Sequence, residues 1–169
     1  MNIGLSLRIL IVLSLMAGAM GVAGQGSARI LRIYAFSRMV SPGNRPVDST
    51  YSFQPQSEYL IYVEANGKDL QFVNFWIDKK NYDVSVLKLD TNIVEVGKDA
   101  TTQLKVKIKG SKSNTIWLLE ASLSAPQKKM PPKYKNLKKG LGLLAVFYKS
   151  KKQYFIISPI TRLMPDNIL

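Results

Sequence analysis

Apolar and polar residues alternate along most of this 169-residue chain, and this period of two constrains the fold more than any other feature. Successive side chains of a β-strand point to opposite faces of a sheet, so such alternation is typical of strands with one face in a core. The alternating segments are rich in β-branched and aromatic residues, and turn-forming residues separate them. No helical heptad and no internal repeat is visible. We therefore predict an all-β protein.

Nine segments have the length and pattern of strands, and their spacing is typical of a β-sandwich or a barrel. The clearest local signal lies in residues 58–78, where two strand-like runs flank Asn66 and Gly67. An Asn-Gly pair tolerates the positive φ angles of a type I′ turn, so we predict a β-hairpin there. The other strands are predicted at residues 29–36, 82–89, 93–96, 102–109, 115–123, 141–148 and 153–157.

The number of strands favours a single-domain antiparallel β-sandwich of the immunoglobulin-like class. Trp76 would then be the core tryptophan, although the cysteine pair against which such a tryptophan packs in antibody domains is missing. The chain has no cysteine at all, so packing must hold the domain together without disulfides.

Residues 1–24 have the pattern of a secretory signal peptide, with Arg8, an apolar run and then small residues. The alternative is a retained membrane anchor, but the second half of the apolar stretch is rich in Gly and Ala, and a spanning helix needs about 20 predominantly apolar residues. We predict cleavage after Gly24, with cuts after Ala19 or Ala23 as the alternatives, which leaves one domain over residues 25–169 without a transmembrane helix. The absence of Asn-x-Ser/Thr sequons favours a bacterial protein that is periplasmic or secreted.

The net charge of +13 is distributed unevenly. Residues 25–100 contain nine basic and nine acidic residues, whereas residues 101–169 contain fourteen basic and two acidic ones. A positive field of this kind attracts polyanions. Lysine is a flexible point charge, so its excess over arginine favours loose, salt-sensitive attraction to an anionic glycan or to lipid phosphate at a membrane surface. Nucleic acid is disfavoured, because an exported protein rarely meets it and no arginine-rich face or RNP pattern is present.

Two segments carry most of the positive charge. In the predicted strand at 102–109, lysines alternate with Leu104, Val106 and Ile108, which predicts three buried aliphatic side chains and three lysines in water. Such lysines either protect a strand edge from aggregation or form a contact surface. Residues 126–140 contain six lysines, three prolines and no acid, and are predicted to form a solvated, extended loop. The candidate anion-binding residues are Lys105, Lys107, Lys109, Lys128, Lys129, Lys133, Lys135, Lys138 and Lys139.

Aromatic residues suggest a second kind of surface. Strict alternation would place Phe72 and Trp76 on one face of their strand, opposite Phe75. The strand is either covered on both faces, or it presents a patch to a partner protein or a carbohydrate. Tyr134, among the lysines of residues 126–140, adds an aromatic ring of the kind that stacks on sugars or bases. Phe72, Trp76 and Tyr134 are the candidate partner-contact residues.

The chain has no histidine and no cysteine, which excludes Ser-His-Asp and Cys-His catalysis, thiol redox chemistry and His-ligated metals. A pair of carboxylates remains as a catalytic possibility, and Glu120 is the lone acid within residues 101–165, where an ion pair with lysine explains it more simply. We expect no catalytic residues, metal or cofactor. The predicted function is an exported, non-catalytic binding or structural module of the cell envelope that docks to a partner protein. The alternative is a polyanion-binding module that uses the lysine-rich C-terminal half.

Overall fold

The computed structural model describes residues 29–40, 56–67, 69–124 and 126–165. The all-β class is confirmed for these residues, which form strands and one short 3-10 turn, η1 (Pro132–Tyr134). The strands are β1 (Arg29–Val40), β2 (Gln56–Asn66), β3 (Leu70–Ile77), β4 (Lys80–Leu89), β5 (Ile93–Lys98), β6 (Lys105–Lys109), β7 (Thr115–Leu123), β8 (Gly142–Tyr148), β9 (Lys151–Ile157) and β10 (Ile160–Arg162). None of the described residues forms a helix long and apolar enough to cross a membrane. The predicted signal peptide at residues 1–24 lies outside the described residues.

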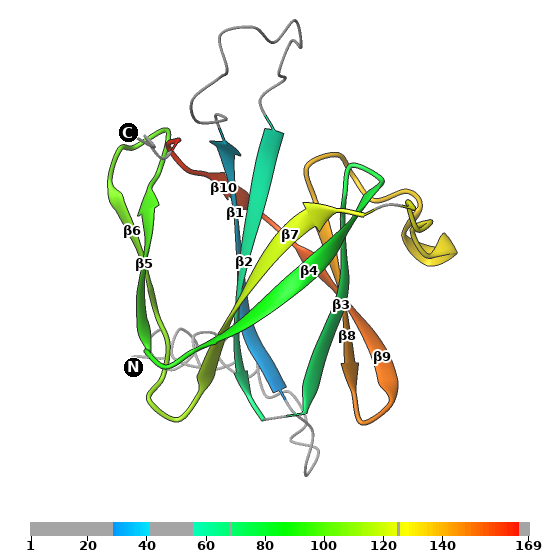
Figure 1. Ribbon diagram of the computed structural model, residues 1–169, viewed down its shortest axis with the longest axis horizontal. Helices are drawn as coiled ribbons and strands as arrows, with labels where there is room; N and C mark the ends of the chain where they lie inside the picture. The colour runs from blue at the N-terminus through cyan, green and yellow to red at the C-terminus, as the bar shows by residue number, and fades with distance from the viewer. Residues whose placement is uncertain (1–28, 41–55, 68, 125, 166–169) are drawn as a thin grey trace, which may run out of the picture.

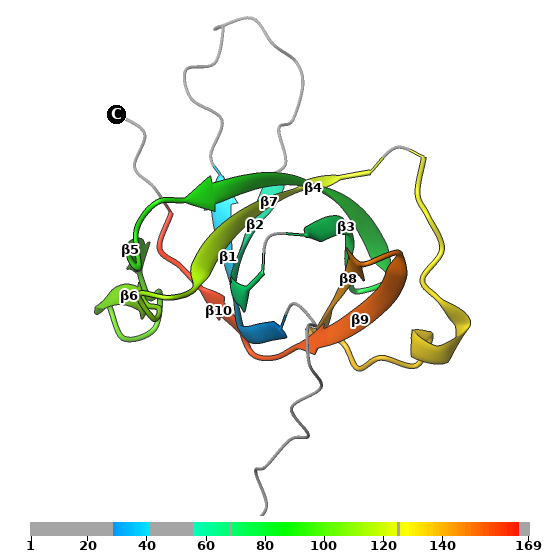
Figure 2. The same ribbon diagram turned by 90° about the horizontal axis from the view of Figure 1, so that it is seen from below.

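Eight strands form one mixed sheet in the order β10-β1-β2-β7-β4-β3-β8-β9, in which only the β1–β10 pair is parallel. The sheet curls until β9 comes against β1, so that the strands surround the interior (Figure 2). Strands β5 and β6 form a separate hairpin at one side of the sheet (Figure 1). The immunoglobulin-like sandwich of two sheets stays a prediction.

The predicted hairpin at Asn66 and Gly67 is wrong. Strands β2 and β3 follow one another in the chain, but β7 and β4 lie between them in the sheet. Both edges of β2 are taken by β1 and β7, and both edges of β3 by β4 and β8. The two strands instead place apolar side chains in the same core cluster, among them Ile61 and Val63 of β2 and Phe75 of β3. β2 and β3 therefore lie on different sides of the interior of the curled sheet.

Two-residue hairpin turns occur elsewhere. Asp78 and Lys79 join β3 to β4, and Lys149 and Ser150 join β8 to β9. All four residues have positive φ, at 48° and 66° in the first turn and 45° and 63° in the second. These are the φ values of type I′ turns, and here residues other than glycine adopt them.

The main core fills the interior of the curled sheet. Phe75, Ile61, Leu119 and Leu144 come from four different strands of this sheet and are fully buried there. Because the inner side chains of all the large strands meet in one cluster, burial of their apolar surface is the main force that holds the curl closed.

A second apolar cluster joins the β5–β6 hairpin to the sheet. Ile108 of β6 packs with Phe36, Leu60, Tyr62 and Ile116 of the sheet strands. Ile108 is buried as predicted, and Val106 is partly buried. Leu104 contradicts the prediction, because β6 begins at Lys105 and the Leu104 side chain is 70% exposed.

Candidate functional site

The segment 126–140, which we call the flap, leaves the end of β7 and returns to β8 on the outside of the sheet (Figure 1). Its Met130, Tyr134 and Leu137 pack against a buried cluster on the outer face of β3 and β8, whose members include Trp76 and Leu143. The prediction of a solvated loop is therefore wrong for these apolar residues. The flap covers Trp76, which is only 2% exposed.

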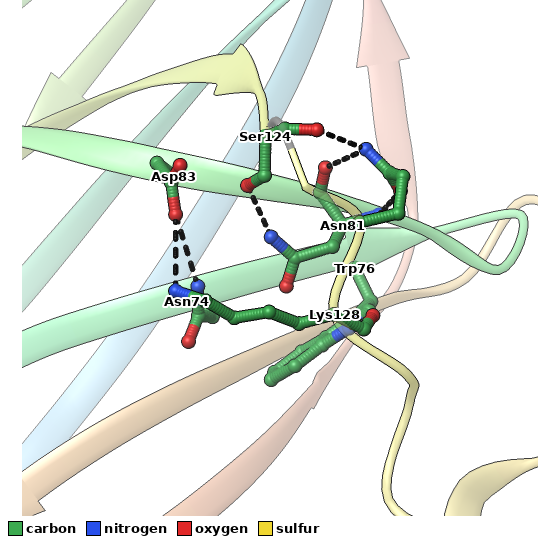
Figure 3. A network of polar contacts seen from close by, with 7 residues as sticks. Asn74, Trp76, Asn81, Asp83, Ser124 and Lys128 are labelled. Carbon is green, nitrogen blue, oxygen red and sulfur yellow. Dashed lines mark hydrogen bonds and ion pairs between the residues drawn. The ribbon is translucent and has the colours of Figure 1, made fainter.

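Hydrogen bonds fix the entry to the flap (Figure 3). Asn81 of β4 is fully buried, and its side-chain amide donates to the hydroxyl of Ser124. The Gln127 side chain accepts from the Asn81 backbone N–H at 2.8 Å and donates to its carbonyl at 3.1 Å. The indole N–H of Trp76 donates to the Lys128 carbonyl at 3.2 Å. These contacts tie the backbone of the first flap residues to β3 and β4.

The middle and the exit of the flap are also held in place. The η1 turn is closed by a hydrogen bond from the Tyr134 N–H to the Pro131 carbonyl at 2.9 Å. At the exit, the Gly140 N–H donates to the carboxylate of Asp78 in the β3–β4 turn at 2.8 Å. Hydrogen bonds therefore join the flap backbone to the sheet at its entry and exit, and a local turn closes its centre.

The six lysines of the flap all point into solvent while its apolar residues point inward. Lys128 forms an ion pair with Asp83 at 3.5 Å, and both side chains are more than half exposed. Among the described residues, no carboxylate lies within ion-pairing distance of the other five: Lys129, Lys133, Lys135, Lys138 and Lys139. Five of the six flap lysines thus carry a positive charge that no ion pair within the described part of the chain offsets.

Neighbouring elements add cations and aromatic rings to this surface. The Asp78–Gly140 hydrogen bond brings the end of the flap to the β3–β4 turn, where Lys79 and Lys80 follow Asp78 in the chain. The rings of Tyr134 and Tyr154 lie 5.4 Å apart. The ammonium groups of Lys133 and Lys152 lie 5.7 and 5.4 Å from the ring centres of Tyr134 and Tyr154, respectively. Such cation–π contacts hold the two ammonium groups over a partly exposed aromatic pair.

The sequence did not identify Lys79, Lys80, Lys152 or Tyr154 as members of this site, because their position depends on strand order. A signal for the buried side of the flap was present. Met130, Tyr134 and Leu137 recur at spacings of four and three residues within an otherwise polar segment. Large apolar side chains in a lysine-rich segment indicate that part of the segment packs against the core.

Phe72 and Trp76 do not form a common patch. A β-bulge interrupts the pairing of β3 with β8 between Phe72 and Asn74, and the extra residue changes which side chains share a face. Phe72 joins the interior cluster, whereas Trp76 lies on the outer face under the flap. With exposures of 8% and 2%, both are part of the core. The third candidate, Tyr134, is partly buried and lines the basic surface.

The nine candidate lysines separate into two groups. Lys105, Lys107 and Lys109 lie on the β5–β6 hairpin, on the opposite side of the molecule from the flap (Figures 1 and 2). Lys105 and Lys107 bind the Glu95 carboxylate at 3.0 and 3.6 Å. The pKa of Glu95 is lowered, mainly because its carboxylate accepts a hydrogen bond from Lys105. The hairpin lysines are thus partly neutralised, and the flap has the larger uncompensated charge.

Glu120, the carboxylate considered for catalysis, lies on β7. Its side chain is exposed on β7, opposite Leu60 of β2 and Ser85 of β4. Within the described part of the chain, no three His, Cys, Asp or Glu residues group in a way that could hold a metal ion.

Comparison with known protein families, curated proteins and solved structures finds no match to this chain. The interpretation of the site therefore depends on its geometry. That geometry defines a protein with a lysine-rich surface supported by a buried tryptophan.

Proposed function

We propose that this protein is a non-catalytic binding module whose flap binds a polyanion, either an acidic glycan or the phosphates of a lipid surface. The observation that carries the proposal is the set of five exposed flap lysines without a carboxylate partner among the described residues. Like charges on adjacent residues repel one another, and an anionic polymer relieves this repulsion.

The anchored flap backbone supports binding of this kind. Because the flap is already ordered by its apolar cluster and hydrogen bonds, binding does not have to pay for ordering its backbone. Lysine side chains are flexible point charges, which suits a ligand with irregularly spaced anions better than a single, shaped phosphate site. The Tyr134–Tyr154 pair beside the lysines adds an apolar surface suited to a sugar ring.

The cellular setting is part of the proposal and derives from the sequence. The signal-peptide pattern of residues 1–24 supports export to a bacterial periplasm or beyond, where acidic glycans and lipid phosphates are abundant surfaces. We also retain the sandwich interpretation. In it, β10-β1-β2-β7 and β4-β3-β8-β9 are two halves that face each other across the interior core.

Docking to a partner protein of the envelope is the second candidate. The observation that favours it is the free edge of β6, which has β5 as its sole hydrogen-bonded neighbour among the described strands. A partner strand could extend this hairpin by backbone pairing. The exposed lysines of β6 oppose such pairing, since charged side chains protect strand edges from association. For this reason the polyanion proposal comes first.

A comparison of two variants with equal net charge tests the proposal. The flap variant replaces Lys133, Lys135 and Lys138 by Gln, and the control variant replaces Lys105, Lys107 and Lys109 by Gln. Binding is measured to dextran sulfate and to vesicles containing phosphatidylglycerol, with neutral dextran and phosphatidylcholine vesicles as blanks. At about 1 kcal/mol per lysine near an anionic surface, the flap variant should bind roughly a hundredfold more weakly.

The two probes distinguish the glycan from the lipid surface, and the control variant should retain most of its affinity. Equal weakening of both variants would mean that net charge alone attracts the probes, and the flap would not be a site. Failure of the unmodified protein to bind either anionic probe would refute polyanion binding.

A further inference from the structure

A second site lies away from the flap, at the start of β1. A bulge at Leu31 shifts the pairing of β1 with β2, so that Arg32 stands directly opposite Glu64. Next to this pair, the connection from β6 to β7 completes an open hollow of about 510 Å³. Its polar lining includes Arg32, Glu64, Lys109, Ser111 and Asn114.

Glu64 is an unusual member of this lining, because it is a carboxylate with only 3% of its surface exposed. Its Oε1 accepts a hydrogen bond from the Ser111 N–H at 2.9 Å and another from the Asn114 side-chain amide at 2.6 Å. The pKa of Glu64 is lowered, mainly because its carboxylate accepts the hydrogen bond from the Ser111 backbone. The group is therefore ionised near neutral pH.

The other oxygen of Glu64 lacks a comparable partner. Oε2 is buried and has no hydrogen-bond partner among the described residues. The Nε of Arg32 lies 3.9 Å away, which is too far for a hydrogen bond. Leaving a buried, ionised acceptor without a donor is costly, and buried polar groups in proteins are normally satisfied. Oε2 thus has the capacity to accept one strong hydrogen bond.

Two cations border the same hollow. The Arg32 side chain is 61% exposed, so its guanidinium is able to rotate and to use several donors. Lys109, the last residue of β6, is exposed. An isolated amine entering the hollow would be repelled by these cations, and an isolated carboxylate would pair with them but leave Glu64 Oε2 without a donor. The lining favours a ligand that carries both charges close together.

We propose that this hollow binds the zwitterionic head group of an α-amino acid, free or at the end of a larger ligand. Its ammonium group donates to Glu64 Oε2, after Arg32 rotates outward to open the path. Its carboxylate binds the guanidinium of Arg32 and the ammonium of Lys109. The ammonium and carboxylate of an α-amino acid are attached to one carbon, so a single head group reaches both Glu64 and Arg32 once the Arg32 side chain has left its 3.9 Å contact with Glu64. This inference does not depend on the function of the flap.

The test is an NMR titration of the whole domain with D- and L-alanine. The reporters are the Ser111 backbone amide and the Asn114 side-chain amide, since both donate to Glu64. Ethylamine and propionate, at the same pH and ionic strength, each supply one of the two charges. Saturable shifts with either enantiomer of alanine, and at least about tenfold weaker binding of the single-charge probes, are expected from the loss of a charge-assisted hydrogen bond or ion pair.

Variants of exposed residues keep the test independent of folding. Arg32→Ala and Lys109→Ala should each weaken alanine binding several-fold, whereas Lys105→Ala, on the same strand but bound to Glu95, should leave it unchanged. The proposal is overturned if alanine gives no saturable shift at these reporters or if ethylamine or propionate binds as well as alanine. It also fails if Lys105→Ala weakens binding as much as Arg32→Ala.

Discussion

Replacement of Trp76 by alanine should destabilise the protein and also release the flap. Trp76 is 2% exposed between the sheet and the flap. A buried tryptophan removes roughly 150–250 Å² from water, which at about 25 cal/mol per Å² corresponds to about 4–6 kcal/mol. Truncations of large aromatic residues in protein cores typically cost about 3–5 kcal/mol. We expect Trp76→Ala to lower the free energy of unfolding by that amount.

The share of this free energy that holds the flap can be derived from the composition of the cluster. Of the six other residues in the cluster, Met130, Tyr134 and Leu137 belong to the flap, so about half of the stabilisation acts between the flap and the sheet. Half of 3–5 kcal/mol is about 2 kcal/mol, and this corresponds to a roughly thirtyfold increase in the population of open flaps. Loss of the indole hydrogen bond to the Lys128 carbonyl acts in the same direction.

Limited trypsin digestion measures flap opening, because the enzyme cleaves after lysine and the flap contains six. Mass spectrometry identifies the first cut, and urea denaturation gives the global stability. Phe72→Ala is the matched control, since Phe72 is a buried aromatic residue of the same strand that lies in the interior cluster. Both variants should lose similar stability, but the first cut should move to the flap and accelerate in Trp76→Ala alone.

Two results would refute this reasoning. One is cleavage of the flap at the same rate in the unmodified protein and in Trp76→Ala, as expected for a loop that is already free. The other is equal acceleration of flap cleavage in Phe72→Ala, which would mean that the flap opens only when the whole domain unfolds.

Three further predictions concern packing and ionisation. A Cβ added at Gly142 would lie 2.5 Å from the Phe75 ring, so Gly142→Ala should lower the free energy of unfolding, measured by urea denaturation, by about 1–3 kcal/mol. Unchanged stability would contradict the packing of β8 against Phe75. Burial raises the pKa of Tyr82 from 10.0 to about 12. The contribution of Tyr82 to stability should therefore be complete below pH 10 and decline towards pH 12, and Tyr82→Phe should remove that decline. An absorbance titration in which every tyrosine ionises near pH 10 would contradict this prediction. The Ser111 hydrogen bond lowers the pKa of Glu64 from 4.5, so this carboxylate should stabilise the fold above pH 4.5 and less at lower pH. Glu64→Gln should flatten the acid side of the profile of stability against pH. An unchanged profile in this variant would contradict the prediction.

Local patterns in the sequence were sufficient to predict where most strands lie. The predicted strand at 115–123 coincides with β7, and the other predicted strands overlap observed ones. Strand β10 was missed because three residues are too few for a visible alternation. The hairpin at Asn66 and Gly67 failed for a different reason. A turn signal shows where the chain changes direction, but the identity of the paired strands depends on how the whole sheet buries its apolar faces.

The candidate site was only partly predictable for related reasons. Lysine content identified the flap. A single bulge in β3, however, placed Phe72 and Trp76 on different faces, and the alternation of apolar and polar residues in a sequence does not reveal such an extra residue. Whether the nine lysines share one face was likewise set by strand order, which places the β5–β6 hairpin and the flap on opposite sides. The Glu64 hollow depends on residues from β1, β2 and the β6–β7 connection, which only the folded chain brings together.

The salt dependence of polyanion binding tests the central claim most directly. Binding of dextran sulfate to the unmodified protein is measured over a range of salt concentrations, next to the flap variant with Lys133, Lys135 and Lys138 replaced by Gln. Each lysine that contacts an anionic polymer releases counterions and adds roughly 0.7–0.9 to the magnitude of the slope of log binding constant against log salt. We predict a steep negative slope that becomes shallower by about two in the flap variant. An equal slope in the two proteins, or binding that does not respond to salt, would contradict the assignment of the flap as the polyanion site.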